Sequence, residues 1–186
     1  MQLRWSHAVV YVRDLDDMLD FYTGVLGFQV TDRGPLGHPK GPEIVFMSQV
    51  ETDHHQLAFL PVRKGEENSN SVNHFAFRLD SLDEIKAMHE RLTADGRATE
   101  INPLTHGNAW SVYFSDPEGN GIELFCDSPW HVTQPQVRPW DIGKPNDEVV
   151  KATRAEFQKE PGFGPIDEFY AARKAALTEA GILSER

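Results

Sequence analysis

Short runs of apolar residues, spaced in turn like strands and like helices, organise the first 127 positions of the chain. Residues 5–12 are rich in β-branched and aromatic side chains and predict a strand. Apolar residues then recur at helical spacing from Leu15 to Val25, and Asp14 can cap the start of that helix. Three more strands are predicted at residues 28–31, 43–49 and 54–62, with a loop rich in Gly and Pro at 34–42.

The same order of elements begins again after a polar segment at residues 64–71, which predicts a linker. A strand at 72–79 precedes the capping box at 81–84, which starts a helix that ends at Gly96. We expect a short strand at 98–101, a loop at 102–108 and a hairpin over 113–125 with the turn Asp-Pro-Glu-Gly-Asn.

The two halves match in sequence as well as in element order. His74 falls on His7, and Glu123 on Gln56, at the same shift of 67 positions. Several matches at one register indicate an internal repeat. We therefore predict an α+β domain over 1–128, in which two βαβββ modules (module one, 3–63; module two, 72–127) pair into a cupped mixed sheet.

The composition changes after this domain. Residues 129–186 are predicted to be a C-terminal extension, an extended segment followed by two helices at 146–159 and 165–180. The extended part contains Trp130, Trp140 and several prolines. We expect the extension to cover the domain or to contact another copy, and we expect a homo-oligomer.

The amino-acid composition argues against several classes of protein. The formal net charge of −11 argues against a nucleic-acid binder and against attachment to anionic membranes. A single cysteine, Cys126, fits a reducing cytoplasm, and the start of the chain has no signal-peptide pattern. No apolar run approaches the ~20 residues of a membrane span. We expect a cytoplasmic protein.

The repeat groups three polar residues into a candidate metal site. His7 and His74 take equivalent places in the first strand of each module, and Glu123 interrupts an apolar strand. If a pseudo-twofold axis relates the modules, both imidazoles face one groove. Two His and one carboxylate suit non-haem Fe(II). Taken singly, a strand His is more often a core residue, and a buried Glu can simply meet an Arg; the shared register favours metal binding.

Four motifs resemble those of the vicinal oxygen chelate superfamily, which includes glyoxalase I, fosfomycin-resistance enzymes, bleomycin-binding proteins and type I extradiol dioxygenases. They are S-H-A-V-V-Y-V, D-F-Y-T-G-V-L-G-F, N-H-F-A-F-R-L and Y-F-S-D-P-E-G-N-G-I-E-L-F, and the resemblance covers residues 3–127. These motifs are typical of the superfamily and do not identify the reaction.

Further residues resemble the extradiol branch, most closely its small single-domain members. His55 is similar to the histidine that faces O₂ there, Tyr113 to the tyrosine that hydrogen-bonds a substrate oxygen, and His106 to a third active-site histidine. His106 lies two residues nearer the tyrosine than in that pattern. The resemblance implies Fe(II) held by His7, His74 and Glu123, a small aromatic diol and O₂ as substrates, a place in aromatic catabolism, and His55 as the proton shuttle.

Other interpretations stay open. Gln56 stands where glyoxalase-like isomerases have a fourth, carboxylate ligand, which disfavours an isomerase. The motifs are also compatible with a transferase of the superfamily, with Mn(II) or Zn(II), and with a metal-free small-molecule binding protein. His54 and His55 could be an exposed turn pair, and Tyr113 a core aromatic. No separate organic cofactor site is predicted.

Overall fold

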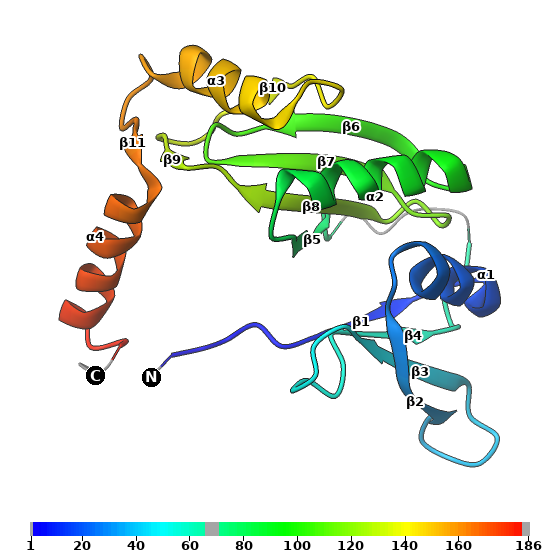
Figure 1. Ribbon diagram of the computed structural model, residues 1–186. Coiled ribbons are helices and arrows are strands. Elements are labelled where there is room, and N and C mark those ends of the chain that lie inside the picture. The colour runs from blue at the N-terminus through cyan, green and yellow to red at the C-terminus, as the bar shows by residue number, and fades with distance from the viewer. Residues whose placement is uncertain (1, 66–70, 184–186) are drawn as a thin grey trace.

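A computed structural model describes residues 2–65 and 71–183 (Figure 1). This part of the chain forms one large sheet on each module and a small two-stranded sheet in the extension. Residues 66–70, the middle of the predicted linker, lie outside the described residues. The mixed α+β fold and the presence of C-terminal helices confirm the predicted fold class. No helix in the described part of the chain is long and apolar enough to cross a membrane.

Module one forms a four-stranded sheet with the order β1-β4-β3-β2. Its elements are β1 (Ala8–Tyr11), α1 (Leu15–Asp20), the π-helical segment η1 (Phe21–Val25), β2 (Gln29–Pro35), β3 (Glu43–Ser48) and β4 (Leu57–Leu60). The first strand is shorter than predicted, because β4 offers parallel partners only to Ala8–Tyr11. His7 and Trp5 therefore precede the strand. As predicted, Asp14 caps α1 by accepting from the backbone N–H of Asp17.

Module two forms a five-stranded sheet with the order β10-β6-β7-β8-β5. Its own elements are β5 (Phe75–Arg78), α2 (Leu82–Asp95), β6 (Thr99–Thr105), β7 (Ala109–Ser115) and β8 (Gly121–Asp127). The predicted loop at 102–108 is wrong over its first half. Pro103 disfavours a strand, yet β7 pairs with β6 through Thr105, and a bulge between Thr99 and Asn102 absorbs the irregularity.

The extension contributes to module two as well as projecting from it. Its elements are β9 (Trp130–His131), β10 (Arg138–Pro139), α3 (Asn146–Phe157), β11 (Gly164–Pro165) and α4 (Ile166–Glu179). Strand β10 pairs with β6, and α3 buries Val149 and Phe157. The indole Nε1 of Trp110 donates to Thr153 Oγ1 at 2.8 Å, which ties α3 to β7. By contrast, none of the α4 side chains is buried.

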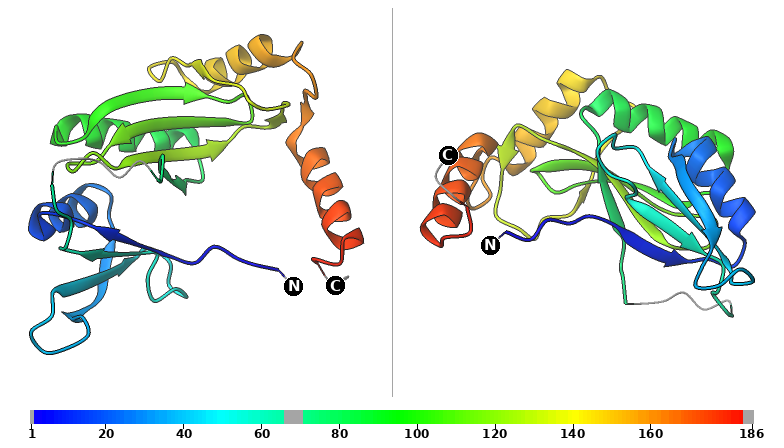
Figure 2. Two further views of the ribbon diagram at one scale, coloured as in Figure 1. Left: turned by 180° about the vertical axis from the view of Figure 1, so that it is seen from behind. Right: turned by 90° about the horizontal axis from the view of Figure 1, so that it is seen from below.

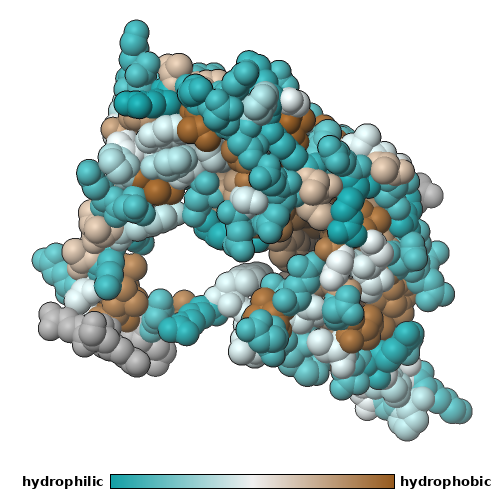
Figure 3. All heavy atoms as spheres, in the orientation of Figure 1, coloured by the Kyte–Doolittle hydropathy of each residue, from teal (hydrophilic) through white to brown (hydrophobic). Residues whose placement is uncertain are grey.

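One core joins the two modules. Helices α1 and α2 lie next to each other on the same side of the molecule (Figures 1 and 2). Buried apolar residues from both modules form a single cluster there, including Met18, Phe21, Ile85, Leu92 and Phe114. On the opposite side, the space-filling view shows an open gap between α4, the N-terminal segment and the module two sheet (Figure 3). The modules are therefore fixed to each other along the helical side.

A buried polar clamp adds to this core. The β7–β8 turn carries Glu118, whose Oε1 accepts the backbone N–H groups of Arg13 and Asp14 at 2.6 and 2.8 Å. Its Oε2 lies 3.2 Å from the guanidinium of Arg63. In the same turn, Asp116 accepts a hydrogen bond from the hydroxyl of Tyr22 at 3.0 Å. Burial raises the pKa of the Asp116 carboxyl, so its hydrogen bonds are needed to keep it charged.

We expect Tyr22→Phe to lower the free energy of unfolding by about 1–2 kcal/mol, because it deprives a buried carboxylate of one donor. Urea denaturation measures the change. Tyr170→Phe is the matched control, since that side chain is half-exposed on α4 and its loss of a hydroxyl leaves stability unchanged. Equal stabilities for both variants would show that the bond to Asp116 does not hold the modules together.

Candidate metal and catalytic site

Strand β8 places Glu123 on the open face of the module two sheet. Its neighbours Ile122 and Leu124 point to the core and are 1% and 4% exposed. Glu123 points the other way but is still only 8% exposed. Its Oε1 accepts a hydrogen bond from the fully buried Ser111 Oγ at 2.7 Å. One oxygen of the carboxylate is thus held, and the other is left for a partner.

The residue that faces the second oxygen of Glu123 is His74, which is also a member of the predicted triad. His74 Nε2 lies 3.2 Å from Glu123 Oε2. The other ring nitrogen, Nδ1, faces the Oδ1 of Asn73 at 2.7 Å and donates its proton there. Nε2 and Oε2 then face each other either as imidazolium and carboxylate or as two ligands of one cation. Cis ligands at ~2.1 Å from a metal are roughly 3 Å apart, so this spacing fits a metal ion.

Tyr113 and His106 lie beside this pair. Tyr113 is the direct cross-strand neighbour of Glu123, and its hydroxyl lies 2.9 Å from His106 Nε2. His106 Nδ1 donates to the backbone carbonyl of Gln136 in the extension. Nε2 is therefore the acceptor of the Tyr113 hydroxyl. Burial, followed by the nearby Glu123 carboxylate, raises the pKa of Tyr113, so the phenol stays protonated at neutral pH.

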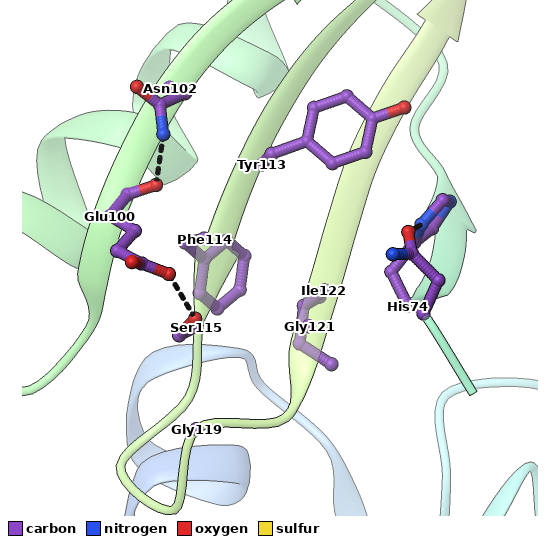
Figure 4. A pocket seen from close by; sticks show the side chains of 10 residues that line it. His74, Glu100, Asn102, Tyr113, Phe114, Ser115, Gly119, Gly121 and Ile122 are labelled. Atoms are coloured by element: carbon purple, nitrogen blue, oxygen red, sulfur yellow. Dashed lines mark hydrogen bonds between the residues drawn. The ribbon is translucent and has the colours of Figure 1, made fainter. Parts of the chain in front are cut away.

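His74 and Tyr113 border an open pocket of about 480 Å³. Glu123 and His106 border a second pocket of about 220 Å³, which Tyr113 also lines. Figure 4 shows the phenol of Tyr113 directed across β8 towards the side on which His74 lies. Glu100 and Ser115 form another part of the wall and are joined by a hydrogen bond of 3.0 Å. Tyr113 is thus the side chain that the two pockets share.

The module one residues form a second, separate group. The ring centroids of His7 and His55 are 4.2 Å apart, and the ring of Phe46 packs against His55. Burial, followed by the charges of His7 and His54, lowers the pKa of His55. The side chain of Gln56 binds the backbone and neither histidine ring: its Oε1 accepts a hydrogen bond from the N–H of Gln49 at 2.8 Å.

The six predicted site residues thus fall into two half-sites. One consists of His74, Glu123, Tyr113 and His106 on module two, and the other of His7 and His55 on module one. Within the described residues of one chain, no group of three or more His, Cys, Asp and Glu side chains is placed to hold a metal ion. The placement of His7 next to His74 and Glu123 stays a prediction for the functional protein.

Sequence reasoning missed three groups that orient this site. They are the Ser111 hydroxyl on Glu123, the Asn73 amide on His74 and the Gln136 carbonyl on His106. The sequence does indicate a role for Ser111, because a serine two residues from Tyr113 in an apolar strand faces the same side of the sheet. No sequence pattern indicates the role of the Gln136 carbonyl, since every residue has a backbone carbonyl.

Residues 4–124 match the family described as the glyoxalase/bleomycin resistance protein/dioxygenase superfamily. The chain belongs to this superfamily, as the sequence motifs predicted. Among characterised relatives, it is 31% identical to a biphenyl-2,3-diol 1,2-dioxygenase of Metapseudomonas furukawaii over 83% of this chain and 52% of that one. It is 27% identical to a catechol-2,3-dioxygenase of Bacillus subtilis over 96% of this chain and 56% of that one. The chain spans about half the length of these relatives.

Solved structures of the same fold include fosfomycin resistance proteins. FosX of Listeria monocytogenes, in complex with Mn(II) and sulfate, has a TM-score of 0.52 at 21% identity and covers 68% of this chain and 93% of that one. FosX of Mesorhizobium loti has a TM-score of 0.52 at 26% identity, over 67% of this chain and 91% of that one. In both comparisons, about a third of this chain lies outside the matched part.

We expect Ser111→Ala to lower the free energy of unfolding of the metal-free protein by about 1.5–3 kcal/mol, because a buried carboxylate loses a hydrogen-bond donor. Ser115→Ala on the same strand is the control: its hydroxyl bonds the exposed Glu100, and its removal changes stability by less than about 0.5 kcal/mol. Chemical denaturation compares the two. A Ser111→Ala protein as stable as the control variant would mean that Glu123 does not depend on this bond.

Proposed function

We propose that the protein is an Fe(II)-dependent extradiol dioxygenase that cleaves the ring of a catecholic aromatic with O₂. The observation that carries this proposal is the contact of His74 with Glu123 directly beside the Tyr113–His106 hydrogen bond. The first pair offers metal ligands, and the second offers a proton donor and a proton acceptor beside them. The relatives named as diol and catechol dioxygenases support this reaction class.

His74, Glu123 and His7 would hold the metal. The donor set fits a divalent ion: His74 and Glu123 present Nε2 and Oε2 to each other, and each is fixed from behind by Asn73 or Ser111. Fe(II) bound there would supply a Lewis acid and a redox-active ion for the reaction of a diol with O₂. A set of two histidines and one carboxylate leaves coordination positions open for both.

The protein's own groups would orient the diol and move its protons. The Tyr113 hydroxyl is positioned at the pocket and can donate to a diol oxygen once it turns from His106. His106, held by the Gln136 carbonyl, can take or return a proton at Nε2. His55 stands next to His7 and would act as the proton shuttle.

The orientation of Gln56 disfavours an isomerase with four protein ligands. Its carboxamide oxygen accepts a hydrogen bond from the backbone N–H of Gln49. The side chain borders a different pocket, together with Leu26, Phe28 and Phe77. A neutral amide therefore stands where such an isomerase would need a carboxylate ligand.

The reaction class can be tested on the reconstituted protein. We expect protein loaded anaerobically with Fe(II) to convert catechol or 2,3-dihydroxybiphenyl in the presence of O₂ to a yellow ring-opened product, followed by absorbance. Treatment with a chelator abolishes the colour and Fe(II) restores it. Turnover of methylglyoxal–glutathione hemithioacetal without any turnover of a catechol would replace this proposal with an isomerase.

We expect His55→Ala to keep its iron and lose about 10²–10⁴-fold in kcat, because it removes a proton-transfer group and no ligand. His54→Ala is the matched control, since His54 is the adjacent, exposed imidazole. Iron content and oxygen uptake are measured on both. Loss of iron from His55→Ala would mean that His55 is itself a ligand.

A further inference from the structure

The turn between β6 and β7 holds His106 and packs against the C-terminal extension. Gly107 in this turn has a φ of +79°, which favours glycine, and a Cβ atom there would lie 2.6 Å from a side-chain atom of Val132 and 2.9 Å from the ring of Phe157. Val132 and Phe157 belong to the extension and are fully buried. The backbone next to His106 is therefore placed partly by the extension.

One side chain of the extension, Gln134, is bonded to both partners of the hydrogen bond that holds the His106 ring. That bond runs from His106 Nδ1 to the backbone carbonyl of Gln136. The Nε2 group of Gln134 donates to the backbone carbonyl of His106 at 2.8 Å, and its Oε1 accepts the backbone N–H of Gln136 at 2.9 Å. A single carboxamide thus links the backbone of the histidine to the backbone of its acceptor.

The chemistry of this contact requires an amide. A carbonyl oxygen only accepts and a backbone N–H only donates, so the side chain between them must offer one donor and one acceptor at its end. An ionised glutamate has no donor, and a methionine of similar length has neither group. Nε2 of Gln134 also faces the carbonyl of Val132 at 3.2 Å and Oδ1 of Asn108 at 3.3 Å, which fixes the orientation of the amide.

The segment that carries Gln134 is itself anchored on both sides. Arg138 donates to the backbone carbonyl of Glu156 at 3.1 Å, and its guanidinium lies 4.3 Å from the centre of the Phe157 ring in α3. Strand β10, which contains Arg138, pairs with β6 opposite Thr105, the residue before His106. The contact between Gln134 and the turn is therefore part of a fixed arrangement.

These bonds align the ring of His106 with the rest of the site. Because Nδ1 holds its proton on the carbonyl of Gln136, Nε2 presents its lone pair to the hydroxyl of Tyr113 at 2.9 Å. The same Nε2 lies 3.8 Å from Oε1 of Glu123. If the carbonyl moved away, the ring could exchange tautomers, and an Nε2–H group would reverse the hydrogen bond to Tyr113. Gln134 borders the same pocket of about 220 Å³ as these three side chains.

We propose that Gln134 is a positioning residue of the candidate active site, which keeps the proton of His106 on Nδ1 and so leaves Nε2 free to accept a proton. The part that His106 plays in the reaction rests on the proposed function. The hydrogen-bond arrangement does not, because it consists of groups of this chain alone. Through Gln134, the C-terminal extension takes part in the site.

The tautomer of His106 in the metal-free protein is the direct test. Nitrogen NMR of protein with isotope-labelled histidine, recorded at about pH 9 where imidazole side chains are neutral, distinguishes a ring nitrogen that carries a proton from one that does not. We expect His106 to carry its proton on Nδ1 in the wild-type protein and to show a mixture of both tautomers in Gln134→Met. The signals that disappear in His106→Ala identify its nitrogens.

Gln158→Met is the matched control, since Gln158 is an exposed glutamine of the extension whose amide donates to the backbone of Ala155. Its His106 signals are those of the wild-type protein. Gln134→Glu, which retains the acceptor and loses the donor, is a second variant that also gives a mixture. Unchanged His106 signals in folded Gln134→Met, or in Gln134→Glu should the former not fold, overturn the proposal.

Turnover shows whether the effect of Gln134 passes through His106. For the iron-loaded protein and catechol, we expect Gln134→Met to lower kcat about tenfold with KM within about twofold of the wild-type value, because it misdirects a proton-transfer group and removes no substrate contact. In a His106→Ala background, the same change has no further effect on kcat. Losses that multiply in the double variant would mean that Gln134 acts independently of His106.

The NMR readout without metal separates this role from the proposed function. If the iron-loaded wild-type protein turns over no catechol, the proposed function is refuted, and the tautomer alone decides whether Gln134 positions His106. If catechol is turned over and Gln134→Met shifts the tautomer without changing kcat, the role of Gln134 in the reaction is refuted.

Discussion

The buried carboxylate of Glu123 is the constraint on which the site depends. An ionised acid on an almost fully buried strand position costs several kcal/mol unless it is bonded. Here Ser111 binds one oxygen and His74 faces the other. The rest of the module two half-site follows from strand geometry, because antiparallel pairing sets Tyr113 directly across from Glu123. A group that is costly to bury and remains open to one side is typical of a functional position.

A second buried carboxylate has a purely structural role. Glu118 has no opening to a pocket of this kind: it joins the backbone of Arg13 and Asp14 to the guanidinium of Arg63. This clamp joins module one to module two. Among the described residues of one chain, the His7–His55 pair and the His74–Glu123 pair form separate groups, and no three potential ligands meet.

Much of the fold could be predicted from periodicity and turn chemistry, because strand and helix spacing repeat in both modules. The candidate triad could be predicted from its register, and the structure places two of its members, His74 and Glu123, next to each other. Two things could not be predicted. Pro103 disfavours a strand over the second half of β6, and pairing with β7 in the adjacent hairpin outweighs that preference. The separation of His7 from His74 and Glu123 depends on how the two modules pack against each other, and a repeat in the sequence does not reveal that packing.

The most direct test of the account is the amount of Fe(II) bound per chain, measured by anaerobic equilibrium dialysis for the wild-type protein, Glu123→Gln and Glu100→Gln. Glu100 is an exposed carboxylate in the pocket that His74 and Tyr113 line, and it serves as the control. The account predicts one Fe(II) per chain for the wild-type protein and for Glu100→Gln, and none for Glu123→Gln at the same free iron. Equal binding by Glu123→Gln and the wild-type protein would contradict it.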